Sequence, residues 1–453
     1  MARQLFGTDG IRGVAGEFPL DPSTAHAFGS ALGHWAKEHD SDPEVVIGMD
    51  TRESGPWLAA QVAGGLARSG VKTRFAGLIT TPGVAYLTRT QHFVAGVMIS
   101  ASHNPYQDNG LKAFDHSGFK LPDDQELLIE AEIFAAREAG VEAVAAELHV
   151  DETLDKAYAD YLASTVSCSF AGRKVVLDCA NGAASHLATE LFQRLGASVI
   201  AIGCEPNGRN INLNSGALHV ENLRAEVLKQ QAHLGVAFDG DADRAILVSH
   251  SGKIIDGDSM LLVLANSMHE SGRLAASDGG PIVVATVMSN LGLERALGEG
   301  GIQLVRTPVG DKYVLEEMVR RGAPIGGEQS GHVIFREFAT TGDGMLTALR
   351  VMEIMQSSGR NLDDLTSRLH IYPQLLVNVR VKNRKPLAEL FHVQEEIQLA
   401  EASFGGAGRV LVRFSGTEPL ARVMVEGPEL SQVEHFAERI ASALRSELGS
   451  DAS

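Results

Sequence analysis

Cysteines and long apolar runs are scarce in this sequence of 453 residues. Its only cysteines are Cys168, Cys179 and Cys204, and their spacing matches neither a metal site nor a redox motif. The sequence therefore carries no disulfide framework, which suits a reducing cytosol. No apolar stretch approaches the roughly 18 residues of a membrane-spanning helix, and residues 1–13 lack the apolar core of a secretory signal. We expect a cytoplasmic protein with no membrane partner.

Positive charge is also in short supply. The chain has 39 Lys and Arg against 57 Asp and Glu, which gives a net charge of −18. Because nonspecific nucleic-acid binding needs a basic surface, we expect no nucleic-acid partner. An anionic small molecule would have to be attracted by local clusters of Arg and Lys, against the sign of the whole protein.

A chain of this length is expected to form several domains, because single cores rarely exceed about 250–300 residues. Three segments repeat the order apolar strand, amphipathic helix, apolar strand, over residues 45–77, 174–203 and 281–307. This order is typical of α/β domains with mixed, mostly parallel sheets. The spacing of more than a hundred residues between the repeats predicts three related α/β domains.

The C-terminal part follows a different order. Strands are predicted at 374–381, 408–414 and 421–427, with one helix near 386–401 and a last helix through Val433 and Leu444. This predicts a smaller α+β domain. An acidic, alanine-rich stretch over 130–165 is expected to be helical and to form the first seam. The predicted domains are 1–155, 156–253, 254–370 and 371–453.

Three aspartates alternate in the segment FDGDADR, residues 238–244, between two predicted strands. On an extended loop, Asp239, Asp241 and Asp243 would point the same way, and their charges would repel without a cation. Carboxylate oxygens favour Mg²⁺, Mn²⁺ or Ca²⁺. An EF-hand is excluded, because Arg244 and His250 stand where Gly and Glu are required. A solvated acidic turn is an equally weighted alternative.

Ser102 lies in a polar loop that follows the apolar strand FVAGVMIS. We expect it to be exposed at the end of that strand, where ligands gather in open α/β sheets. His103 is its neighbour, and adjacent side chains diverge on an extended backbone, so a hydrolase triad is not supported. A serine that accepts a phosphoryl group depends more on cations such as Lys112 than on a strong base. For this loop alone, a structural turn rich in Ser and Asn remains the more common explanation.

Arginine and hydroxyl side chains cluster in RFSGTEPLAR, residues 413–422, between two predicted strands. Arginine binds phosphate with two hydrogen bonds, and Gly416 lets backbone N–H groups approach an anion. The segment predicts a phosphate site, and an ordinary hairpin with surface arginines is the alternative.

Weaker signals come from shorter loops. GGEQSGH, residues 326–332, offers Glu328 and Ser330 to sugar hydroxyls, and its His332 can titrate near neutral pH. Three further loops offer cations, which alone are more often structural than functional: Arg12, Arg52 and Lys312.

Together, these motifs resemble those of the α-D-phosphohexomutase family. The resemblance extends from Phe6 to Arg422 and keeps the family's motif order. It implies four domains around a central cleft, with one motif from each domain facing it. It also implies a mutase that moves a phosphoryl group between two oxygens of a small-molecule sugar phosphate. The implied cofactors are one Mg²⁺ per chain and a sugar 1,6-bisphosphate, which serves as intermediate and activator.

The resemblance also implies a role for each motif residue. Ser102 matches the family's phosphoserine, and Asp239, Asp241 and Asp243 match its Mg²⁺ ligands, with Ser102 as the fourth. Charge stabilisation or proton transfer is implied for Arg12, Lys112, His332 and Arg244. Substrate binding is implied for Glu328, Ser330, Lys312, Arg413, Ser415, Gly416, Thr417 and Arg422.

Two positions narrow the resemblance to the branch that acts on glucosamine phosphates. They are Gln329, where related enzymes for neutral sugars usually carry Met, and Gly416, which stands where Asn is common in the family. The bisphosphate would then be glucosamine 1,6-bisphosphate. The segments 212–216 and 217–220 depart from the family pattern. A mutase for glucose or mannose phosphates is the alternative, and a sugar-phosphate-binding protein without catalysis is a distant one. The N-terminal domain offers a face for a homodimer, although the sequence does not fix the oligomeric state.

Overall fold

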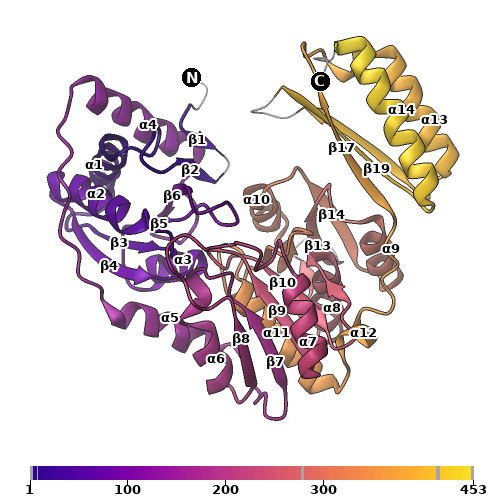
Figure 1. Cartoon of the computed structure of the whole chain (residues 1–453), viewed down its shortest axis with the longest axis horizontal. Coiled ribbons are helices and arrows are strands. Elements are labelled where there is room, and N and C mark those ends of the chain that lie inside the picture. Colours follow the sequence, from indigo (N-terminus) through magenta and orange to yellow (C-terminus); the bar gives the residue numbers. More distant parts are fainter. Residues whose placement is uncertain (1–3, 8, 277–279, 415–418, 450–453) are drawn as a thin grey trace. The chain divides into compact units, whose positions relative to one another are not determined.

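The computed structural model describes residues 4–7, 9–276, 280–414 and 419–449 (Figure 1). The chain forms two compact units, one of residues 1–288 and 301–367 and one of residues 289–300 and 368–453. The first unit carries most of three α/β domains, and the second carries the C-terminal domain. Within the described ranges, no helix is both long and apolar enough to cross a membrane.

The first domain is built on one six-stranded mixed sheet. Its elements are β1 (Phe6–Gly7), β2 (Gly10–Val14), α1 (Pro22–His39), β3 (Glu44–Met49), α2 (Gly55–Arg68), β4 (Lys72–Leu78), α3 (Thr81–Thr90), β5 (Ala95–Ile99), β6 (Asp108–Asp115), α4 (Asp123–Glu138) and, after an extended segment, α5 (Glu152–Ser164). The strand order is β1-β2-β6-β5-β3-β4. The strands β4, β3 and β5 are parallel, and the others pair antiparallel.

Both faces of this sheet are buried, as the unbroken apolar sequence of β3 predicts. Val45 and Ile47 pack in the core that contains α1, α2 and α4. Val46, which points to the opposite face, packs in the core that contains α3 and α5. The predicted strand–helix–strand unit is confirmed here, and it leaves the ends of β3 and β5 at one edge of the sheet.

The second domain has a five-stranded mixed sheet of order β11-β10-β9-β7-β8. Its elements are β7 (Lys174–Asp178), η1 (Ala183–Ser185), α6 (Ala188–Arg194), β8 (Ser198–Ile202), α7 (Glu221–Gln230), β9 (Leu234–Phe238), β10 (Ala245–Ser249) and β11 (Ile254–Ile255). The pair β9–β10 is antiparallel, and the acidic segment forms the connection between the two strands, as predicted. The connection starts where β9 leaves the buried core.

The third domain contains β12 (Ala275–Ala276), β13 (Gly280–Thr286), β14 (Gln303–Thr307), β15 (Ile325–Gly327) and β16 (Val333–Phe335). Its helices are α8 (Gly257–Glu270), α9 (Leu291–Glu299), α10 (Asp311–Arg321), α11 (Gly344–Ser358) and α12 (Leu362–Leu365). Val314 and Met318 of α10 pack on one face of the sheet. Each of the three sheets combines parallel and antiparallel pairs, so the predicted mixed α/β sheets are confirmed.

The C-terminal domain has an antiparallel sheet of order β17-β19-β18. Its elements are β17 (Gln374–Arg380), η2 (Leu387–Glu389), α13 (Phe391–Phe404), β18 (Arg409–Phe414), β19 (Leu420–Glu426) and α14 (Leu430–Leu448). Both helices pack with one face of the sheet in a single core, which confirms the predicted α+β domain.

Two helix predictions were wrong in extent. The stretch 130–165 is two helices, because Gly140 turns the chain at φ 63° after α4 and the segment up to Val150 then runs extended. The helix predicted at 386–401 begins later, at Phe391, and continues until Gly405 ends it with φ 55°. Both glycines adopt the left-handed conformation that stops a helix.

The fold predicts a pH-dependent cost for Tyr158→Phe. The Tyr158 hydroxyl, fully buried, donates to Asp343 Oδ2 at 2.8 Å, and its loss leaves a buried carboxyl one donor short. We expect about 1–3 kcal/mol lower stability to chemical denaturation. Burial raises the pKa of Asp343 to about 6, so its ionisation costs stability as pH rises from about 4 to 6. Removing the hydroxyl raises that pKa further, and the loss should therefore be larger at pH 8 than at pH 5.

The control for this variant is Tyr86→Phe. Tyr86 stacks on Tyr161 at 4.2 Å between ring centroids, and its hydroxyl makes no hydrogen bond to the described residues. Equal effects of the two substitutions, or a loss that does not change with pH, would contradict the prediction.

Candidate active site

Ser102 is buried in the loop after β5, with 1% of its surface exposed. The prediction of an exposed serine was therefore wrong. Its φ of 52° is left-handed, which turns the hydroxyl toward the second domain. There Oγ donates to Asp239 Oδ2 at 2.5 Å. The serine loop and the acidic loop, separated by more than a hundred residues in sequence, thus meet at one pair of atoms.

His103 lies closer to Ser102 than predicted. Its Nδ1 is 3.4 Å from Ser102 Oγ, because the left-handed turn at Ser102 removes the divergence expected for an extended chain. Arg244 Nη1 lies 3.1 Å from the same nitrogen. Burial, followed by the charges of Arg244 and Arg12, lowers the pKa of His103 to about 4. His103 is therefore a neutral, weakly basic neighbour of the serine at pH 7.

The three alternating aspartates converge as predicted. Asp239, Asp241 and Asp243 each offer one carboxylate oxygen, and these oxygens lie within 4.8 Å of one another. Ala242, at φ 55°, provides the turn that brings them together. All three residues are buried, which excludes the alternative of a solvated acidic turn.

The cluster is electrostatically strained. Burial raises the pKa of Asp239 well above its ordinary value, and the charges of Asp243 and Asp241 raise it further. Asp243 behaves in the opposite way, because His332, Lys112 and Arg244 outweigh the effect of burial and lower its pKa. One carboxyl of the cluster thus favours its neutral form unless further positive charge is supplied.

Lys112 supplies part of that charge. It is 1% exposed, and Nζ lies 2.8 Å from Asp241 Oδ2 and 3.1 Å from Asp9 Oδ2. Burial lowers the pKa of Lys112, but the carboxylates of Asp241, Asp9 and Asp243 outweigh burial and raise it. Lys112 is therefore a permanent cation beside the acidic loop, with Thr81 Oγ1 donating to the same Asp241 oxygen at 2.5 Å.

These residues fit a hard divalent cation. Asp241 Oδ1 and Asp243 Oδ1 are buried and have no hydrogen-bond partner among the described residues, so each carries an unused lone pair where water cannot reach it. The donor set is entirely oxygen, which Mg²⁺ and Mn²⁺ prefer. Asp239, Asp241, Asp243 and the hydroxyl oxygen of Ser102 are the residues that would hold the ion.

A cavity of about 410 Å³ opens beside this cluster. It is lined by His103, the neighbour of Ser102, and by five of the predicted site residues: Arg12, Asp243, Arg244, Glu328 and His332. Arg12 reaches the serine loop at Ala101 O, 3.5 Å away, and also pairs with Asp9. The cavity is large enough for a hexose phosphate and is lined by cations, acids and an imidazole.

His332 is buried between two carboxylates. Its Nδ1 lies 3.6 Å from Asp243 Oδ2, and its Nε2 lies 3.7 Å from Asp311 Oδ2. Burial lowers its pKa, but the two carboxylates raise it by more. The Gly342 N–H donates to Nε2 at 2.9 Å, so the neutral ring would carry its proton on Nδ1, facing Asp243.

The sugar-binding loop is only partly on the cavity. Glu328 lines it, and Glu328 Oε1 accepts from Gly310 N at 3.1 Å. Ser330 is exposed and is not among the lining residues. Gln329 turns away, toward Asp256 Oδ2 at 3.4 Å, so this branch-specific residue does not itself line the cavity.

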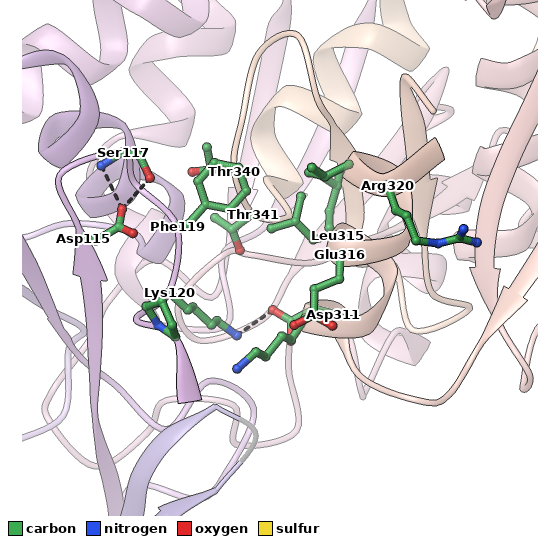
Figure 2. Close-up of a pocket in the computed structure, with 14 residues that line it drawn as sticks. Asp115, Ser117, Phe119, Lys120, Asp311, Leu315, Glu316, Arg320, Thr340 and Thr341 are labelled. Carbon is green, nitrogen blue, oxygen red and sulfur yellow. Dashed lines mark hydrogen bonds and ion pairs between the residues drawn. The ribbon is translucent and has the colours of Figure 1, made fainter. Parts of the chain in front are cut away.

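Lys120 and Asp311 were not predicted, although they complete the ion network. Figure 2 shows their ion pair, in which Lys120 Nζ lies 2.6 Å from Asp311 Oδ2. Lys120 Nζ also lies 2.5 Å from Asp9 Oδ1, so it joins Asp9, which pairs with Lys112, to Asp311, which faces His332. Lys120 directly follows Gly118 and Phe119, and this sequence context carries no recognisable signal of a functional residue.

Lys312 lies apart from the acidic cavity. It lines a separate, largely apolar cavity of about 420 Å³ between β6 and α10, the cavity drawn in Figure 2. It also pairs with Asp123. Its predicted contact with substrate would require this ion pair to break. The role of Lys312 stays a prediction.

The predicted phosphate segment belongs to the second unit. Arg413 of β18 and Arg422 of β19 are direct register partners across the antiparallel pair. Burial and the charge of Arg422 lower the pKa of Arg413. Like charges placed opposite each other destabilise a sheet, so this pair favours an anion between the two side chains. Ser415, Gly416 and Thr417 lie outside the described residues.

Arg52 has a structural role, in place of the free cation considered from the sequence. Its buried guanidinium pairs with Asp50 and donates to four backbone carbonyls of the serine loop, those of Ser102, Asn104, Pro105 and Asp108. The signal for this role was its place directly after β3, where the ends of parallel strands meet.

Models of one protein family match the chain in four consecutive segments. They are described as phosphoglucomutase/phosphomannomutase alpha/beta/alpha domains I, II and III and the C-terminal domain, and they match residues 3–140, 156–252, 256–372 and 376–443. The matches account for nearly the whole chain.

Curated relatives and solved structures agree with these matches. A phosphoglucosamine mutase of Solibacter usitatus is 64% identical, with 99% of this chain and 100% of that protein covered. A phosphoglucosamine mutase of Koribacter versatilis is 48% identical, with coverage of 99% and 98%. A phosphoglucomutase/phosphomannomutase family protein of Burkholderia thailandensis has the same fold, with a TM-score of 0.81, 24% identity and coverage of 99% and 98%.

The carboxylate cluster predicts one divalent-cation site per chain. We expect Mg²⁺ titration calorimetry to give a single site, and Asp241→Asn to weaken binding at least about 10-fold, because it removes a ligand oxygen. Asp9→Asn is the control, since Asp9 also contacts Lys112 but lies outside the cluster. Binding that Asp241→Asn leaves unchanged would show that Asp241 is not a ligand. Equal weakening by Asp9→Asn would show that general charge and not ligation governs the site.

Proposed function

This chain belongs to the phosphoglucomutase/phosphomannomutase family of phosphohexomutases, and from that premise we propose that it interconverts glucosamine 6-phosphate and glucosamine 1-phosphate. Ser102 carries the phosphoryl group in the resting enzyme. The single observation that carries this proposal is the contact of Ser102 Oγ with Asp239 inside the carboxylate cluster, at 2.5 Å. A hydroxyl held there contacts the proposed cation site, and its neighbour His103 lines the substrate-sized cavity.

Mg²⁺ is the ion that we assign to the cluster, held by Asp239, Asp241, Asp243 and the seryl oxygen. When bound, it supplies positive charge beside the transferred phosphoryl group and the seryl leaving oxygen. Its two charges would also restore the ionised form of Asp239, whose pKa burial and its acidic neighbours raise.

Three cations of this chain would stabilise the transferred group. Lys112 is held by Asp241 and Asp9, Arg244 lines the cavity beside His103, and Arg12 reaches the serine loop. Phosphoryl transfer spreads charge over the equatorial oxygens, so fixed cations stabilise its transition state without reorganisation. The high pKa of Lys112 makes it a source of charge and not a proton acceptor.

The reaction consists of two transfers. In the first, a hydroxyl of the sugar phosphate attacks the phosphoserine phosphorus, the Ser102 Oγ–P bond breaks, and glucosamine 1,6-bisphosphate forms. The attacking hydroxyl loses its proton, and we propose neutral His332 as the acceptor: it would take the proton on Nε2, which must first release the Gly342 N–H. In the second, the bisphosphate presents its other phosphoryl group to Ser102 Oγ, and the proton returns to the released sugar oxygen.

The phosphate that is not being transferred would bind to Arg413 and Arg422. Their cross-strand placement supports this, because an anion between them converts repulsion into two charge-assisted contacts. Glu328, which lines the cavity, is the residue that we propose for the sugar's hydroxyl or amino groups. Ser330, Lys312, Ser415, Gly416 and Thr417 complete the predicted substrate site. A cytoplasmic location and a homodimer stay predictions.

The phosphoserine can be tested by intact-protein mass spectrometry. We expect a mass increase of one phosphate on the purified chain, mapped to Ser102 by fragmentation. Ser102→Ala should lose both the adduct and mutase activity, because Ser102 Oγ is the proposed phosphoryl carrier. Ser117→Ala is the control for loss of a hydroxyl in the same domain, since Ser117 Oγ contacts Asp115 and not the cluster. Full mutase activity of Ser102→Ala would contradict the proposal.

The sugar preference can be tested with a substrate panel. We expect kcat/KM for glucosamine 6-phosphate to exceed that for glucose 6-phosphate and mannose 6-phosphate by at least about 10-fold, because relatives that are 64% and 48% identical are named phosphoglucosamine mutases. A neutral hexose phosphate used equally well would assign the chain to the glucose or mannose branch. Binding of all three without turnover would indicate a non-catalytic sugar-phosphate-binding protein.

A further inference from the structure

The backbone of Ser102 is held as tightly as its side chain. Ser102 N donates to Ser100 Oγ at 2.9 Å, and Ser100 Oγ donates in turn to Asp50 Oδ2 at 2.5 Å. The Ser102 carbonyl accepts from two side chains, Arg52 Nη2 at 2.9 Å and Asn212 Nδ2 at 2.9 Å. Arg52 belongs to the first domain and Asn212 to the second.

Asn212 binds the serine loop at two points. Its Nδ2 also donates to Asn104 O, at 3.1 Å, so both protons of one amide group bridge two carbonyls of the loop. Only the NH₂ end of the side chain can make these contacts, since carbonyl oxygens accept and do not donate. Asn212 itself is fixed from the other side, because its backbone N donates to Ala180 O at 2.8 Å.

The acidic loop closes the third side of the Ser102 carbonyl. A Cβ on Gly240 would lie 2.4 Å from Ser102 O and 3.0 Å from Asn212 Nδ2, so the glycine allows this close approach. Gly240 stands between two residues of the carboxylate cluster, Asp239 and Asp241. The acidic loop therefore packs directly against the Ser102 carbonyl and the Asn212 amide that binds it.

We propose that Asn212 is a positioning residue for phosphoryl transfer: it fixes the left-handed backbone of Ser102, and thereby the direction of Oγ, to the domain that carries the carboxylate cluster. The inference rests on the proposed function, since it concerns the aim of the same serine. Arg52 holds the serine loop within the first domain. Asn212 holds the same loop in position relative to the carboxylate cluster of the second domain.

The geometry explains why one amide matters. Ser102 has φ 52°, a conformation that costs about 1 kcal/mol or more for a residue other than Gly and persists only where its surroundings enforce it. Loss of the Asn212 contacts would let the backbone relax, and Oγ would move away from Asp239. A displacement of about 1 Å at the reacting atom can cost about 100-fold in rate.

The test compares Asn212→Gly with Asn214→Gly. Both asparagines lie in the same loop with left-handed φ, 59° and 52°, so glycine fits both backbones equally well. The Asn214 side chain is exposed and makes no hydrogen bond to the described residues, so this variant controls for loop flexibility. The full-length enzyme with Mg²⁺ is assayed with glucosamine 1-phosphate and glucosamine 6-phosphate, with kcat and KM determined separately.

We expect Asn212→Gly to lower kcat about 10- to 100-fold with KM changed less than about 3-fold, because sugar contacts are untouched. Its melting temperature should match that of Asn214→Gly. Equal kcat values in the two variants would overturn the inference, and so would a loss explained by a melting temperature that falls only in Asn212→Gly.

A second readout does not depend on turnover. Hydrogen exchange of the peptide covering residues 100–109 should be faster in Asn212→Gly than in Asn214→Gly. A wild type without mutase activity would refute the proposed function, and the exchange comparison would still decide whether Asn212 holds the serine loop. Identical exchange in both variants would refute that role.

Discussion

Three buried carboxylates that share one small volume are the constraint on which the rest of the site depends. Asp239, Asp241 and Asp243 lie too close to remain ionised together without compensating charge. The surroundings supply it only in part, through Lys112 and Arg244, whose pKa values these acids raise in spite of burial. The remaining deficit is what a divalent cation in the proposed site would offset.

Few strands and loops of the fold position the residues of this site. Lys112 reaches the acids because β5 and β6 pair antiparallel, with Met98 opposite Lys112, so the chain returns past the serine loop it has just left. The acids stand on the short connection of another antiparallel pair, β9 and β10. Two tight returns, one from each domain, thus place Ser102 and the carboxylate cluster against each other, and loops this short leave little freedom to misalign.

Sequence patterns predicted what is local. The apolar runs that became β3, β7 and β13 predicted the three α/β domains, because burial on both sheet faces needs uninterrupted apolar residues. The alternation of Asp239 to Asp243 predicted convergence, because it depends on neighbouring residues only. The burial of Ser102, the contacts of Arg52 and the Lys120–Asp311 pair were not predicted, since each depends on residues from distant segments. The two-residue strand β1 carries no pattern at all.

The negative net charge of the protein opposes the binding of a sugar phosphate. With a net charge of −18, the chain repels anions at long range. A sugar phosphate must therefore be attracted by local clusters of Lys and Arg side chains. Lys112 and Lys120 are committed to carboxylates, and Arg12 pairs with Asp9. Arg413 and Arg422 are register partners across two strands, and burial and the charge of Arg422 lower the pKa of Arg413. A phosphate dianion between the two side chains would offset this repulsion, which is why the arginine pair supports the proposed phosphate site.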